Sequence, residues 1–144
     1  MRPSEQSDSE TGLPDPPSAN AGYMGPEHKA FFRAILEHER RKIMARIDRS
    51  VQALREQENL PEEVDRAQLN EQRALELRLR DRDRRHLGKI RAALLRLDRD
   101  EYGWCEETGE PIGLERLKAR PTATLSVEGK EIREQIEKAY VRSR

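Results

Sequence analysis

The sequence has little of the material from which a compact globular core is built. Aromatic residues make up 4% of its 144 positions and apolar residues 34%, whereas charged residues make up 39%. A single-core globule of this length usually carries more apolar and aromatic side chains. The composition therefore favours an elongated, mostly helical protein with a small core and some disorder.

Cysteine and long apolar runs are also scarce. The single cysteine excludes an internal disulfide and a zinc site made of several cysteines. No apolar run approaches the roughly 20 residues that a membrane span needs. The first ten residues lack the apolar centre of a signal peptide. We therefore expect a soluble cytoplasmic protein.

The charge shows no excess of either sign, with 28 basic and 28 acidic residues. A neutral total argues against general binding to DNA or to an anionic membrane. The distribution is uneven, because residues 66–99 hold eleven basic and five acidic side chains. Such a stretch is ordinarily a solvated helix surface, and in a neutral chain it also suggests a docking face.

Proline separates a first segment from the rest. Residues 1–24 contain four prolines among small and polar residues, which predicts a disordered tail. Gly25 and Pro26 then predict the start of a helix, since proline is tolerated in the first helical turn.

Two long segments of nearly equal length follow, separated by Asn59–Leu60–Pro61. Each carries an apolar seam with the 3-4-3 spacing of a coiled coil. The seam residues are Met44, Ile47, Val51 and Leu54 in the first segment and Leu87, Ile90, Leu94 and Leu97 in the second. At 1.5 Å per residue each helix would be about 50 Å long. We predict an antiparallel coiled-coil hairpin over residues 25–100, with its tip near residues 59–67, that projects into solvent.

Residues 101–144 have a different texture, rich in turns. They predict a small globular domain that needs support from the hairpin base, because so short a segment cannot bury a sizeable core. Its expected core residues are Trp104, Ile112, Leu114, Leu117, Leu125 and Val127. A final amphipathic helix is predicted after Gly129, with Ile132, Ile136 and Tyr140 on one face.

Several motifs in this chain resemble those of the DksA/TraR family of bacterial transcription factors. They are Tyr102–Glu106 (YGWCE), Pro111–Leu117 (PIGLERL), Lys118–Ala123 (KARPTA) and Val64–Ala67 (VDRA). The resemblance implies a hairpin that enters the secondary channel of RNA polymerase and modulates promoter open complexes, in many members together with ppGpp. It implies no enzymatic activity, and hence no catalytic residues.

The resemblance also assigns the hairpin tip. The family pattern Asp-x-x-Asp-x-Ala falls on Glu62, Asp65 and Ala67, so glutamate replaces the first aspartate. An acidic tip near the polymerase active site can meet basic or polar groups there. An acid at a helix N-terminus also stabilises the helix through its dipole, which is the structural alternative for Asp65.

Three cations correspond to the family's ppGpp-binding positions, namely Lys89, Arg120 and Lys130. Lysine and arginine suit pyrophosphate groups as a point charge and a bidentate donor, respectively. Arg82 and Arg116 resemble further polymerase-contacting positions. Ordinary surface cations are the alternative for all five.

The family's zinc finger of two Cys-x-x-Cys pairs is degenerate here. Its four positions are occupied by Cys105, Thr108, Ser126 and Gly129, and hydroxyls are not normal zinc ligands. We therefore expect no zinc and a domain held by packing and hydrogen bonds. Cys105 is interpreted as a buried relic rather than a redox switch.

The leading hypothesis is a monomeric, zinc-independent regulator that binds RNA polymerase and ppGpp. A coiled-coil adaptor that keeps the fold but does not regulate polymerase is the alternative. A DNA-binding finger protein is disfavoured by the neutral charge and the degenerate metal site.

Overall fold

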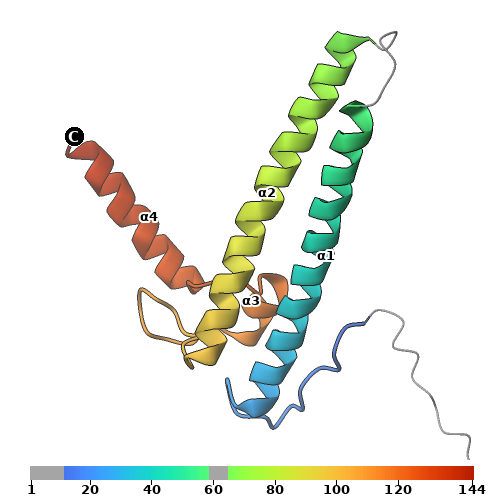
Figure 1. The fold of residues 1–144 in the computed structure, drawn as a ribbon. Coiled ribbons are helices and arrows are strands. Elements are labelled where there is room, and N and C mark those ends of the chain that lie inside the picture. The colour runs from blue at the N-terminus through green and yellow to red at the C-terminus, as the bar shows by residue number, and fades with distance from the viewer. Residues whose placement is uncertain (1–11, 59–64) are drawn as a thin grey trace, which may run out of the picture.

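The structure, a computed structural model that describes residues 12–58 and 65–144, is dominated by a long helical hairpin. Within these residues there are four helices, α1 (Pro26–Glu58), α2 (Arg66–Asp98), α3 (Leu114–Ala119) and α4 (Val127–Arg142). Helices α1 and α2 run antiparallel side by side, and α3 and α4 lie near the base of the hairpin (Figure 1). The predicted fold class is confirmed. Among the described segments, none of the helices is long and apolar enough to cross a membrane.

The seam between α1 and α2 agrees with the predicted one on α2 and differs on α1. Leu87, Ile90 and Leu97 are buried, as their spacing predicts. On α1, however, Ile43 is fully buried whereas Met44 is 42% exposed. The correction has a simple cause, since Ile43 continues the stripe begun by the buried Phe32 and Leu36, and the next residue points about 100° away.

Most of the burial lies at the base of the hairpin. Side chains from α1, α2 and the segment after α2 form one apolar cluster, which we call the base core; its buried members are Met24, Phe32, Leu36, Ile43, Leu87, Ile90, Ala93, Leu97, Tyr102, Cys105, Ile112 and Leu117. Nearer the tip, Leu75, Leu77 and Leu79 are about half exposed. There Arg46 pairs with Asp83 at 2.9 Å, so polar contacts join the helices.

The segment before α1 is structured where the sequence predicted a disordered tail. Tyr23 donates a hydrogen bond from its hydroxyl to the Gly103 carbonyl at 2.6 Å and accepts one from the Gly113 amide at 3.0 Å. Met24 lies in the base core, and its side chain occupies the space where a Cβ at Gly103 would lie. We call residues 18–24 the strap. The prediction is therefore corrected at its C-terminal end, and residues 1–11 lie outside the described residues.

Residues 100–130, which include α3 and the first turn of α4, form what we call the finger module. Ile112 and Leu117 are buried, and Leu114 and Leu125 pack against the base core, as predicted. Trp104 and Val127 are instead 39% and 51% exposed, which corrects their assignment to the core.

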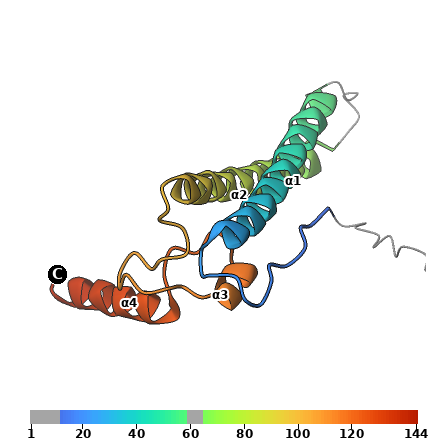
Figure 2. The same ribbon diagram turned by 90° about the horizontal axis from the view of Figure 1, so that it is seen from below.

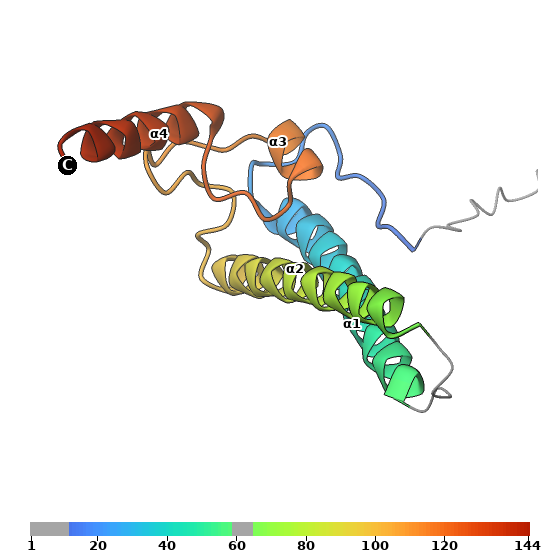
Figure 3. The same ribbon diagram turned by 90° about the horizontal axis from the view of Figure 1, so that it is seen from above.

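Helix α4 leaves the finger module and points away from the hairpin. Views along the hairpin place it on the same side as α3 (Figures 2 and 3). The predicted apolar face of Ile132, Ile136 and Tyr140 exists, but these side chains are between 41% and 61% exposed. Among the residues that the structure describes, none covers this face, because α4 starts in the finger module and extends outward.

A first prediction concerns the strap. Tyr23→Phe removes the hydroxyl that bridges two backbone groups, so the free energy of unfolding should fall by about 1–3 kcal/mol. Tyr140→Phe is the matched control, because Tyr140 is 61% exposed and the same atom is removed at the surface. Thermal unfolding followed by circular dichroism measures both. Equal midpoints for the two variants would show that the strap does not stabilise the fold.

Candidate functional site

The hairpin tip carries an acid that caps a helix. Asp65 is the N-cap of α2, and its side chain accepts a hydrogen bond from the Ala67 amide at 3.1 Å. Asp65 and Ala67 are both exposed. The cap satisfies one of the free amides of the first turn, and the negative charge complements the helix dipole. Glu62, the other acid assigned to the tip, lies outside the described residues.

The three cations assigned to ppGpp come from three different elements near the base. Lys89 is on α2, Arg120 follows the last residue of α3, and Lys130 is in the first turn of α4. All three side chains are exposed. They are therefore free of the base core and accessible to an anion, and their joint role remains a prediction.

The two further arginines differ in their surroundings. Arg82 is exposed on α2. Arg116 is half-buried on α3 and donates a hydrogen bond from Nε to the Leu125 carbonyl at 2.8 Å. Arg116 therefore ties α3 to the segment before α4, a structural role that its sequence position did not indicate.

The four degenerate zinc-site positions do come together. Cys105 and Ser126 are 3% and 4% exposed, and the Ser126 hydroxyl donates to Cys105 Sγ at 3.4 Å. The same hydroxyl oxygen accepts the Gly129 amide at 3.0 Å, because Ser126 is the N-cap of α4. Thr108 also hydrogen-bonds to the thiol. One sulfur is thus the centre of a small hydrogen-bond cluster.

This cluster makes the thiol unusually acidic. Burial raises the pKa of the Cys105 thiol, but hydrogen bonds from the side chains and backbone of Ser126 and Thr108 outweigh that effect and lower the pKa to about 6. Hydrogen bonds to a charged form favour that form. The folded chain therefore favours the thiolate form of Cys105 more than an unfolded chain does.

The residues at these positions do not fit zinc. A structural zinc site uses four thiolate or imidazole ligands, and this cluster offers one thiol, two hydroxyls and a glycine. Throughout residues 12–58 and 65–144, no group of three His, Cys, Asp or Glu side chains is arranged to hold a metal ion.

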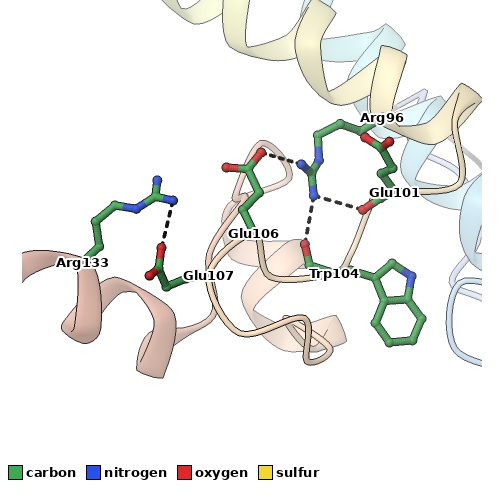
Figure 4. Close-up of polar contacts among 6 residues, drawn as sticks. All are labelled: Arg96, Glu101, Trp104, Glu106, Glu107 and Arg133. Atoms are coloured by element: carbon green, nitrogen blue, oxygen red, sulfur yellow. Dashed lines mark hydrogen bonds and ion pairs between the residues drawn. The ribbon is translucent and has the colours of Figure 1, made fainter.

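A partly buried arginine, Arg96, which was not singled out in the sequence, joins the hairpin to the finger module (Figure 4). Arg96 donates to Glu106 Oε1 at 2.6 Å and to the carbonyl oxygens of Glu101 and Trp104 at 3.0 and 2.9 Å. Its side chain is only 16% exposed. Nearby, Arg133 of α4 pairs with Glu107 at 3.2 Å (Figure 4). The available signal in the sequence was the position of Arg96 in the last turn of α2, because basic residues there often bond to backbone carbonyls at the helix end.

Comparisons with known proteins agree with this architecture. Residues 28–97 match the family described as the N-terminal domain of the DnaK suppressor protein DksA, and residues 100–135 match the prokaryotic dksA/traR C4-type zinc finger. The RNA polymerase-binding transcription factor DksA of Caulobacter vibrioides is 44% identical over 86% of this chain and 88% of its own length. That of Escherichia coli is 41% identical over 81% of this chain and 78% of its own.

A solved structure is also similar. The transcription factor DksA2 from Pseudomonas aeruginosa superposes with a TM-score of 0.75 at 48% sequence identity, over 81% of this chain and 90% of that one. The fold is a helical hairpin on a finger-like base, and the two matched segments cover both of these parts. The chain belongs to the DksA family.

The acidic thiol leads to a prediction about pH. Because the pKa of Cys105 is lower in the folded chain than its ordinary value near 9, the thiolate stabilises the fold fully above pH 9, and this contribution disappears as the pH falls through 6. Between pH 5 and pH 8 the gain should be on the order of 2 kcal/mol. Thermal unfolding across this range, compared with Cys105→Ala, measures it. Parallel pH profiles of the two proteins would contradict the assignment.

Proposed function

We propose that this chain binds RNA polymerase and regulates transcription initiation, with the hairpin inserted in the secondary channel of the enzyme and without chemistry of its own. The observation that carries the proposal is the match over both halves of the chain to proteins named RNA polymerase-binding transcription factor DksA. The protein acts as a cytoplasmic monomer.

The hairpin has the shape that this role needs. Two helices of 33 residues each reach about 50 Å from the base. Burial is concentrated at the base, so the distal half is slender and exposes polar and basic side chains. The basic excess of residues 66–99 supports docking to an acidic channel wall.

At the tip, Asp65 acts through its charge on groups near the polymerase active site, and Glu62 and Ala67 act beside it. The cap does not use up this charge, because the side chain gives one oxygen to the Ala67 amide and remains exposed. The consequence is a change in the stability of promoter open complexes, with binding itself spread along the hairpin, including Arg82 and Arg116.

The alarmone ppGpp is the proposed effector. Lys89, Arg120 and Lys130 face solvent near the base, where a polyanionic ligand can lie between this protein and polymerase. The regulation is independent of zinc, because the finger positions supply a hydrogen-bond cluster instead of a ligand set.

The tip provides the central test. Asp65→Asn removes one charge but keeps the helix cap, since asparagine caps as well as aspartate. We expect a melting midpoint within a few degrees of the parent, because only the interaction of the charge with the helix dipole is lost. The affinity for purified polymerase should stay within about threefold, but most repression of a ribosomal promoter in run-off transcription should be lost. Glu71→Gln is the matched control, with the same charge change on an exposed α2 residue about 9 Å along the helix from Asp65 and outside the tip residues 59–67.

Two outcomes would contradict this proposal. Normal repression by Asp65→Asn would show that the tip charge has no role. If the unmodified chain does not bind polymerase, the alternative of a coiled-coil adaptor that keeps the fold without regulating polymerase is favoured instead.

The effector site has its own test. Arg120→Ala should remove most of the additional repression that ppGpp gives, by roughly tenfold, because a charge-assisted hydrogen bond contributes about 1.5–3 kcal/mol. Its backbone cap of α3 is retained, since that bond uses the amide. Lys138→Ala, an exposed cation on α4, is the control. A ppGpp response that is equal in both variants would exclude Arg120 from the site.

A further inference from the structure

The hydrogen-bond cluster around Cys105 leaves no space for a side chain at position 129. Gly129 is the third residue of α4 and is buried inside the finger module. A Cβ added at Gly129 would lie 2.4 Å from Cys105 Sγ and 3.2 Å from Ser126 Oγ. Carbon and sulfur atoms do not approach to 2.4 Å without a bond, so the sulfur occupies the volume of a side chain at position 129.

Backbone conformation does not account for this glycine. Gly129 lies within a regular helix and is not among the glycines with positive φ. In a helix, alanine is more favourable than glycine by about 1 kcal/mol. Glycine is therefore required at this position because Cys105 Sγ leaves no space for a Cβ atom.

The donors around the sulfur explain why it lies there. Ser126 holds Sγ from one side by its hydroxyl and in turn caps the Gly129 amide. Thr108, at the second finger position, also lowers the pKa of the thiol by hydrogen bonding. Both donors are at finger positions, so the two halves of the former metal site now converge on a single sulfur atom.

We propose that Cys105 and Gly129 form a coupled pair that closes the finger module on the sulfur, so that packing excludes both a fourth ligand side chain and a metal ion. The inference rests on the zinc independence of the proposed function and adds the device that maintains it. A cysteine introduced at position 129 would meet Sγ before it could meet a metal. The metal-free state is thus specified by shape as well as by the loss of ligands.

A double-mutant cycle tests the coupling on the purified full chain in metal-free, reducing buffer. Gly129→Ala should lower the unfolding midpoint by about 5 °C or more despite its helix propensity. Cys105→Ala removes the sulfur, so the double variant Cys105→Ala/Gly129→Ala should melt higher than Gly129→Ala alone. Gly88→Ala is the matched control, a helical glycine with nothing within 4 Å of its added Cβ, and it should melt slightly higher than the parent.

The outcomes decide the proposal. The proposal is overturned if the unfolding midpoint of Gly129→Ala rises as it does in Gly88→Ala. It is also overturned if the effects of Cys105→Ala and Gly129→Ala on stability simply add in the double variant. If Gly129→Ala does not fold, cooperative unfolding of the double variant supports the coupling, and failure of the double variant to fold overturns it.

A separate measurement distinguishes this inference from the function on which it rests. Adding a chelator to the parent chain should leave its midpoint unchanged, because a ligand stabilises only when it is bound to the native state. A fall in the midpoint would refute zinc independence, and with it this inference. An additive cycle with an unchanged chelator result would refute the coupling alone.

Discussion

The base core is the constraint on which the rest of the molecule depends. A finger module of about 30 residues cannot bury enough apolar surface to fold alone, and a slender hairpin has too thin a seam to fix its own orientation. Phe32, Ile90 and Leu117 come from the two helices and the finger module, and all three are fully inaccessible to solvent. The hairpin and the finger module therefore bury each other's apolar side chains in the base core, and loss of either part would expose the apolar face of the other.

Polar contacts then set the geometry that apolar packing leaves free. The guanidinium of Arg96 is held by two carbonyls and one carboxylate, which fixes the turn after α2 in direction as well as in distance. Lys29 and Arg33 of α1 pair with Asp100 and Asp98 across the base. These pairs are exposed and contribute little to stability, so their effect is on the register of the two helices. A fixed register at the base determines where the tip lies about 50 Å away.

The sequence predicted most of what depends on local spacing and little of what depends on distant contacts. The helices and the α2 seam follow from short-range patterns. On α1 the spacing placed Met44 in the seam, one residue away from Ile43, which is the buried residue. The strap was missed because Tyr23 bonds to Gly103 and Gly113, some 80 and 90 residues away, which no local pattern shows. For α4, the spacing of Ile132, Ile136 and Tyr140 predicted the apolar face, but amphipathicity does not indicate whether anything covers such a face. For the site, the residue types at the finger positions excluded a zinc ligand set, whereas the role of Arg96 required the folded geometry.

The two ends of the molecule are independent in physical terms, which bears on how such a protein can change. Asp65 and the Cys105 cluster lie near opposite ends of α2 and, within the described part of the chain, share no hydrogen-bonding partner. Changes at distant sites with separate partners add in free energy. A substitution in the Cys105 cluster therefore alters the stability of the base but leaves the cap and the charge at the tip unchanged. The base has only to remain rigid for the tip to reach the same place, and the hydrogen bonds that join Ser126 to Cys105 and Gly129 contribute to that rigidity.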